Sequence, residues 1–178
     1  AIDATTLTAA PRVVVSNLPY NVGTPLLLGW LRQMAEAPAE APAWESLTLM
    51  FQKEVADRLV AEPGTKTYGR LSVIAQWVAE VETLFTLPAR AFTPPPKVDS
   101  TVVRLTPRTD REAVPFAAIE RATAAAFGQR RKMLRQALKP LGDAEALCRA
   151  AGLEPTARAE TVPVAGFVAL AHVSPTRP

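Results

Sequence analysis

A short run of β-branched residues near the start of the chain constrains the fold most strongly. The run Arg12-Val13-Val14-Val15-Ser16 is continuous, and Asn17-Leu18-Pro19-Tyr20-Asn21 ends it abruptly. An apolar run without polar alternation is typical of a strand buried on both faces of a parallel sheet. We therefore predict a parallel strand here, with the polar turn at its carboxyl end.

Up to residue 60 the chain follows the pattern strand, helix, strand, helix. Thr24-Pro25 predicts a helix start with Thr24 as N-cap, because proline suits the first helical position. The segment 46–51 (SLTLMF) predicts a second strand that leads directly into a helix over 53–60. This alternation indicates a parallel α/β sheet.

Two further strands are predicted at 81–87 and 100–105, separated by the proline-rich segment 92–98 (FTPPPKV). Late strands joined by a proline-stiffened loop favour an antiparallel addition at a sheet edge. Periodicity alone does not assign the apolar stretch 71–78 to a helix or a strand.

The chain becomes helical and Ala-rich from about Pro115. One helical stripe is predicted to run from Phe116 to Leu138, and two short helices lie near 143–150 and 163–172. We therefore expect a sheet domain over residues 1–108 and a small all-α domain over residues 109–178.

Composition and charge exclude several kinds of site and indicate one kind of ligand. One Cys and one His exclude a disulfide framework and a Cys/His zinc or iron–sulfur centre. The chain contains no run of 18 apolar residues, and its first residues do not resemble a signal peptide. We therefore expect a cytoplasmic protein that neither binds a membrane nor holds a metal ion. Residues 1–100 carry 8 Lys and Arg against 10 Asp and Glu, whereas residues 101–178 carry 12 against 7. Fifteen of the 20 basic residues are Arg, whose planar guanidinium suits phosphate groups. The C-terminal part, which carries the surplus of positive charge, therefore suits phosphate binding.

The segment Asn17-Leu18-Pro19-Tyr20 carries the most specific chemistry. Open α/β sheets place their ligands at the carboxyl ends of their strands. The side-chain carbonyl of Asn17 and the backbone carbonyl of Leu18, held by Pro19, can both accept hydrogen bonds from an exocyclic amine. Tyr20 offers a flat face to the base that carries the amine.

This segment resembles the target-amine motif of the ribosomal RNA adenine dimethyltransferases. The segments NLPYNVGTPLLL, FQKEVADRLVAEPGTKTYGRLSV, AFTPPPKVDSTVVRL and AFGQRRKMLRQAL follow in the order and spacing of the bacterial small-subunit branch. The resemblance implies a Rossmann-like S-adenosylmethionine (SAM)-dependent methyltransferase sheet followed by a helical domain. It also implies N6,N6-dimethylation of two adjacent adenosines in small-subunit (16S) ribosomal RNA during ribosome biogenesis.

Site roles follow from the same resemblance. Asn17 and the Leu18 carbonyl would accept the two N6 hydrogens of a flipped adenine, and Tyr20 and Phe92 would stack on its two faces. Asp3 resembles the acidic residue that receives the adenine amine of SAM, and Asn17 would also lie against this cofactor. The family's glycine-rich SAM loop does not occur in the sequence, so we expect the chain to begin near the third or fourth strand of the family's sheet.

A basic cluster is predicted late in the long helix. Arg131, Arg135 and Lys139 would share one face at i, i+4 spacing, beside Arg130 and Lys132. In the family this region approaches ribosomal RNA, so we expect phosphate contacts from Arg130, Arg131, Lys132 and Arg135. Lys97 and Arg70 are expected in loops flanking the pocket, where Lys97 could also contact RNA.

Two alternative functions remain open from the sequence. The chain could belong to a non-catalytic RNA-binding or assembly factor, or to an adenine methylase of large-subunit (23S) RNA that confers antibiotic resistance. The 92–100 and 127–138 segments match the small-subunit enzymes better. The expected partner is the pre-30S particle, bound by a monomer.

Overall fold

The computed structural model describes residues 9–10, 12–19, 22–38 and 41–174. The chain forms two compact units. The first, the sheet unit, comprises Ala1–Val60 and Val78–Asp110, and the second, the helical unit, comprises Ala61–Trp77 and Arg111–Pro178. In these described stretches, no helix has the length and apolar character needed to span a membrane.

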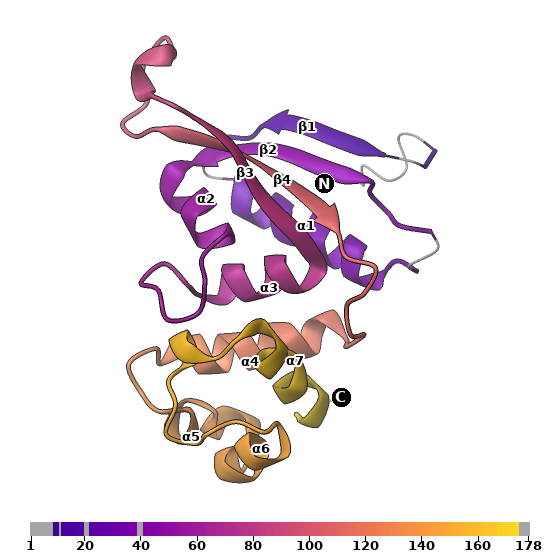
Figure 1. Ribbon diagram of the computed structural model, residues 1–178, viewed down its shortest axis with the longest axis vertical. Coiled ribbons are helices and arrows are strands. Elements are labelled where there is room, and N and C mark those ends of the chain that lie inside the picture. Colours follow the sequence, from indigo (N-terminus) through magenta and orange to yellow (C-terminus); the bar gives the residue numbers. More distant parts are fainter. Residues whose placement is uncertain (1–8, 11, 20–21, 39–40, 175–178) are drawn as a thin grey trace. The chain divides into compact units, whose positions relative to one another are not determined.

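The described residues of the sheet unit form four strands in the order β1-β2-β4-β3, and their arrangement is shown in Figure 1. β1 runs parallel to β2, and β4 pairs antiparallel with both β2 and β3. This confirms the predicted parallel start and the antiparallel addition at the sheet edge. The strands are β1 (Val13–Asn17), β2 (Ser46–Gln52), β3 (Ala79–Leu87) and β4 (Ser100–Pro107).

Helix α1 (Gly23–Glu36) connects β1 to β2, and α2 (Lys53–Leu59) follows β2. The buried side chains of α1, Leu27, Leu31 and Met34, recur at helical spacing. The helix begins at Gly23 and not after Thr24, so the predicted N-cap is wrong. The reason is a backbone turn: the Pro19 carbonyl accepts hydrogen bonds from the N–H groups of Val22 (3.1 Å) and Gly23 (3.0 Å).

The two faces of β1 differ in burial. Val14 and Ser16 are partly buried, whereas the alternate residues Val13 and Val15 are 54% and 77% exposed. Strand alternation places these two pairs on opposite faces of the sheet. Among the described residues the prediction of burial on both faces is therefore wrong for β1, because only the Val14 face is covered.

The described part of the helical unit contains five α-helices. The stretch 71–78 that periodicity left unassigned is helical, as part of α3. Phe127 at the end of α4 stacks on Phe167 of α7 with ring centroids 5.3 Å apart. The helices are α3 (Arg70–Val78), α4 (Phe116–Gly128), α5 (Leu134–Ala137), α6 (Ala144–Ala150) and α7 (Val164–Val173).

Residues 61–77 pack with the C-terminal helices, whereas the sequence placed them in the sheet domain. The fully buried Tyr68 donates a hydrogen bond from its hydroxyl to the Val162 carbonyl at 2.9 Å, and the Trp77 indole N–H donates to the Glu112 carbonyl at 3.1 Å. Burial raises the pKa of the Tyr68 hydroxyl, so it remains a donor at high pH. These partners lie far apart in sequence, which is why periodicity did not reveal the grouping.

The predicted continuous helix from Phe116 to Leu138 is broken. Helix α4 ends at Gly128, residues 129–132 form a turn, and the short α5 follows. The N–H groups of Leu134 and Arg135 donate to the carbonyls of Ala157 (2.8 Å) and Pro155 (3.0 Å) instead of to the preceding helix. Hence Arg131, Arg135 and Lys139 do not share one helix face, because they occupy a turn, α5 and a following 3-10 turn.

A close approach at Gly166 generates a stability prediction. A Cβ added at this buried residue of α7 would lie 2.7 Å from Val162 Cγ1 and 2.9 Å from Leu153 Cδ2. Overpacking of this kind costs about 1–3 kcal/mol, which outweighs the ~0.5–1 kcal/mol that alanine gains over glycine in a helix. We expect Gly166→Ala to lower the free energy of unfolding of the full-length protein in urea titrations.

Gly128→Ala is the matched control. Gly128 also lies in a helix of the helical unit, but a Cβ there meets no atom within 4 Å. This substitution should therefore leave the free energy of unfolding unchanged or raise it by up to about 1 kcal/mol. Equal effects at the two glycines would contradict the packing described for α7.

Candidate functional site

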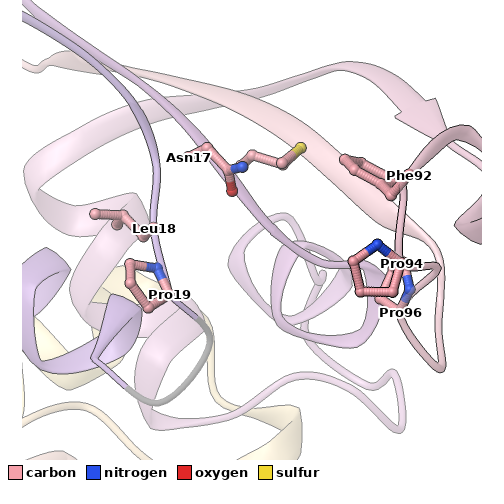
Figure 2. Close-up of a pocket in the computed structure, with 7 residues that line it drawn as sticks. Asn17, Leu18, Pro19, Phe92, Pro94 and Pro96 are labelled. Atoms are coloured by element: carbon pink, nitrogen blue, oxygen red, sulfur yellow. The ribbon is translucent and has the colours of Figure 1, made fainter.

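An open pocket lies at the carboxyl end of β1 within the sheet unit. Asn17, Leu18 and Pro19 face Phe92, Pro94 and Pro96 of the loop between β3 and β4 across the opening (Figure 2). The cavity measures about 310 Å³, near the lower limit of typical small-molecule sites. The structure thus brings Asn17, Leu18 and Pro19 of the predicted motif together with Phe92 at one pocket.

Asn17 presents an unused amide to this pocket. It is the last residue of β1, its side chain is exposed, and no described residue hydrogen-bonds to it. The backbone carbonyl of Leu18 likewise accepts no hydrogen bond from the described parts of the chain, while the Leu18 side chain is buried at 7% exposure. Two hydrogen-bond acceptors, the Asn17 side-chain oxygen and the Leu18 carbonyl oxygen, therefore lie on adjacent residues, and the buried Leu18 side chain fixes their position.

The floor of the pocket comes from β2. Asn17 pairs with Met50 in the parallel register, so both side chains leave the sheet on the same face. This is the face of Val13 and Val15, opposite the buried face of Val14. Met50 is buried and supplies an apolar, polarizable surface beneath the opening. The sequence indicated β2 but not this role of Met50, because the role depends on register.

The loop that carries Phe92 is held by Asp99. One carboxylate oxygen of Asp99 accepts a hydrogen bond from the N–H of Ala89 at 2.9 Å, and its backbone carbonyl accepts from the N–H of Lys53 at 2.9 Å. The Phe92 N–H donates to the Ala89 carbonyl at 3.2 Å, closing a 3-10 turn over Ala89–Ala91. Asp99 was not singled out from the sequence, because its partner Ala89 lies ten residues away.

The pocket favours binding and orientation over acid–base chemistry. Of its seven described lining residues only Asn17 has a polar side chain, and none of the seven is ionisable. Two converging acceptors and flat apolar walls suit a planar ligand that carries hydrogen-bond donors at its edge. No group of three or more potential metal ligands occurs in the described stretches.

Several predicted residues lie elsewhere or outside the described chain. Asp3 and Tyr20 fall outside the described residues. Lys97 is exposed on the Phe92 loop, as expected. Arg70 is not in a loop: it begins α3 and pairs with Glu120 at 3.3 Å within the helical unit.

The predicted RNA-contact cluster is divided by the structure. Arg131, Lys132 and Arg135 are exposed, with no ion-pair partner in the described residues. Arg130 instead pairs with Glu160, its Nε lying 2.9 Å from Oε2. Because the Arg130 guanidinium is paired with Glu160, it is less available to an external phosphate than the side chains of Arg131 and Lys132 are.

Comparison with known proteins identifies relatives of the chain. A family model described as ribosomal RNA adenine dimethylase matches residues 7–174. The chain is 65% identical over 172 residues to ribosomal RNA small subunit methyltransferase A of Rhodospirillum rubrum, covering 96% of this chain and 57% of that protein. It is 58% identical over 177 residues to the protein of the same name from Paramagnetospirillum magneticum, covering 99% and 60%. The chain therefore spans a little over half the length of these relatives.

Solved structures support the fold. A dimethyladenosine transferase from Plasmodium falciparum superposes with a TM-score of 0.71 at 24% identity, over 94% of this chain and 68% of that one. The 23S rRNA methyltransferase ErmE gives a TM-score of 0.60 at 25% identity, over 96% and 68%. The fold is thus the Rossmann-like fold of the SAM-dependent methyltransferases, as predicted.

The role of Asp99 yields a prediction about the Phe92 loop. Asp99→Ala removes the acceptor for the Ala89 N–H, and a hydrogen bond to a charged group contributes roughly 1.5–3 kcal/mol when buried and less when exposed. We expect amide hydrogen exchange in residues 89–92 to accelerate about tenfold in the full-length protein. Asp99→Asn retains a side-chain oxygen and should exchange nearly as the parent does, and equal acceleration in both variants would contradict the capping role.

Proposed function

Because the chain belongs to the ribosomal RNA adenine dimethylase family, we propose that this protein methylates N6 of two adjacent adenosines in small-subunit (16S) ribosomal RNA. The product would be N6,N6-dimethyladenosine, made during ribosome biogenesis in the cytoplasm. The observation that carries the proposal is the exposed, unpartnered Asn17 amide facing Phe92 across the pocket (Figure 2).

The two acceptors at the strand end account for substrate orientation. The Asn17 side-chain oxygen and the Leu18 carbonyl would each accept one hydrogen from the exocyclic amine of adenine. Their combined pull directs the nitrogen lone pair away from the ring plane and toward the methyl donor. Because a sulfonium methyl is strongly electrophilic, orientation and exclusion of water can supply most of the rate without a general base.

Phe92 would hold the adenine after it leaves the RNA stack. Flipping a base costs a few kcal/mol, and stacking on an aromatic ring returns roughly 1–3 kcal/mol. Phe92 is half-buried, on a loop fixed by Asp99, so its ring needs little ordering when the base arrives. Tyr20 is proposed for the opposite face of the base.

SAM supplies the methyl group in this family's reaction. The described pocket fits the acceptor base better than it fits this cofactor, because it offers one amide and no charged side chain to the amino-acid and ribose groups of SAM. We propose that Asn17 borders both molecules and that Asp3 receives the adenine amine of SAM. The remaining SAM contacts do not come from the described pocket residues.

RNA contacts are proposed for exposed cations in both units. Lys97 lies on the same loop as Phe92, where it can reach phosphates next to the flipped adenosine. Arg131, Lys132 and Arg135 of the helical unit offer further cations to the pre-30S particle. One monomer would therefore combine a base pocket with a basic RNA-binding surface.

Asn17→Ala tests the proposed chemistry. Loss of one hydrogen bond that orients a reacting group typically costs about 10²–10³ in rate. We expect methyl incorporation from labelled SAM into unmethylated small subunits to fall by this factor in the full-length protein. RNA affinity should change little, because Asn17 contacts one base.

Two variants serve as controls for Asn17. Asn17→Asp keeps an acceptor oxygen and should retain more activity than Asn17→Ala. Ser16→Ala alters the neighbouring residue of β1, which points to the opposite face, and should stay near parent activity. Equal incorporation by Asn17→Ala and the parent would remove Asn17 from the mechanism and favour a binding factor without catalysis.

Substitution of Phe92 separates stacking from simple apolar packing. Phe92→Leu keeps apolar volume but loses the ring face, so kcat/KM should fall about 5- to 150-fold, the equivalent of 1–3 kcal/mol. Phe92→Tyr keeps the ring and should remain within a few-fold of the parent. A Leu variant as active as the Tyr variant would show that Phe92 does not stack on the substrate.

A further inference from the structure

Dimethylation places two methyl groups on the same nitrogen, so the pocket must accept both adenine and N6-methyladenine. In each round N6 forms a bond to the methyl carbon of SAM, the carbon–sulfur electron pair stays on sulfur, and N6 releases one proton to solvent. After the first round N6 carries a single hydrogen, so the Asn17 side-chain oxygen and the Leu18 carbonyl can no longer both accept from it. A methyl group must then lie where one of the two hydrogen bonds was.

The Leu18 carbonyl is the more rigid of the two acceptors. Pro19 fixes the backbone that follows it, and the Pro19 carbonyl accepts hydrogen bonds from the N–H groups of Val22 (3.1 Å) and Gly23 (3.0 Å). The Leu18 side chain is buried and packs beside α1, since a Cβ added at Gly23 would lie 3.5 Å from Leu18 Cβ. The Asn17 amide ends a side chain that can rotate, which favours the Asn17 side for the methyl group.

Met50 is the pocket-lining side chain next to Asn17 on this side. The two residues pair in the parallel register of β1 and β2, and neighbouring strands lie about 4.8 Å apart. On its other side Met50 pairs with Val102 of β4, which is apolar and partly buried. Met50 itself is buried and forms part of the pocket wall. The surface beside the Asn17 amide is therefore apolar, as a methyl group requires.

Met50 is also the lining side chain that can most readily change its shape. The ring of Phe92 lies on a turn that is closed by hydrogen bonds. Methionine is unbranched and has three rotatable side-chain bonds, so it adapts to irregular space at low cost. Rotation of Met50 can therefore give room for one methyl group without a movement of the backbone. Three other lining residues are stiff rings, namely Pro19, Pro94 and Pro96.

We propose that Met50 is a specificity-determining residue that seats the N6-methyl group during the second transfer. Its side chain rotates to admit the methyl group, and the apolar contact takes over the orienting role of the hydrogen bond that Asn17 loses. The inference rests on the proposed function, because it takes N6-methyladenine as the substrate of the second round. It gives a residue of β2, outside the segment 17–20, control over whether the reaction stops at one methyl group.

Met50→Ile tests this role by stiffening the side chain at nearly constant volume. Isoleucine is branched at Cβ and restricted at χ1, and it suits a strand, so the variant should fold as the parent does. The full-length protein is incubated with SAM and unmethylated small subunits, and mass spectrometry of the digested RNA follows N6-methyladenosine and N6,N6-dimethyladenosine over time. One extra methyl group in a close-fitting apolar pocket changes kcat/KM by about 10- to 200-fold. We expect the second transfer to slow at least about tenfold more than the first, so that the monomethyl product accumulates.

Two variants control for packing. Met50→Leu is branched one carbon further from the backbone, so its ratio of the two rates should fall between those of the parent and Met50→Ile. Met34→Ile makes the same change at the buried methionine of α1, which is not among the pocket-lining residues, and should keep the parent's ratio. Equal slowing of both transfers in Met50→Ile, or the same change of ratio in Met34→Ile, would overturn the proposal.

A binding measurement without SAM separates space from chemistry. The probes are two transcripts of small-subunit ribosomal RNA that differ only in carrying adenosine or N6-methyladenosine at the two target positions. Met50→Ile should bind the methylated transcript about fivefold or more weakly, relative to the unmethylated one, than the parent does. Met34→Ile should keep the parent's relative affinity. A Met50→Ile variant with the parent's relative affinity would show that Met50 does not seat the methyl group.

Failure of this inference and failure of the proposed function give different results. A parent protein that transfers no methyl group to small subunits would contradict the proposed function, and the binding measurement would still decide on Met50. A parent that makes the dimethyl product, together with a Met50→Ile variant that keeps the parent's ratio of the two rates, would overturn the role of Met50 alone.

Discussion

The parallel pairing of β1 with β2 fixes the part of the structure on which the pocket depends. The register sets Asn17 beside Met50 at the point where β1 ends, so the amide and the apolar floor share one face of the sheet. Pro19 then turns the chain into α1 through its own carbonyl, and the Leu18 carbonyl accepts no hydrogen bond from the residues that the structure describes. A shift of one residue would send the Asn17 side chain to the buried face and abolish the site.

The helical unit depends in a comparable way on one guanidinium. Arg130 satisfies two backbone carbonyls and one carboxylate from segments that share no local structure. The break in the helix at Gly128 is what frees Arg130 to reach them, because a continuous helix would have carried the side chain along a single face. The same break puts Arg131 and Lys132 in an exposed turn.

The two units differ in charge and polarity, and they therefore suit different parts of a ligand. The pocket of the sheet unit has one amide and no ionisable side chain, so it can orient a base but cannot compete for phosphates. In its described residues, the helical unit has unpaired cations and no strongly exposed large apolar side chain, so it suits a phosphate backbone better than a base. The proposed recognition of a flipped adenosine within a large RNA would use both properties.

Local patterns in the sequence determined the strand–helix alternation, the antiparallel late strands and the motif at Asn17, because each is encoded within a few consecutive residues. The tertiary structure alone decided the start of α1, the exposed face of Val13 and Val15, the helix break at Gly128 and the grouping of residues 61–77 with the C-terminal helices. It also decided the roles of Met50, Asp99 and Arg130. The start of α1 follows from a short turn in which the Pro19 carbonyl binds N–H groups only three and four residues further on, a contact that hydrophobic periodicity does not record. The grouping of residues 61–77 and the roles of Asp99 and Arg130 depend on hydrogen bonds between residues ten to nearly a hundred positions apart, which no local pattern records.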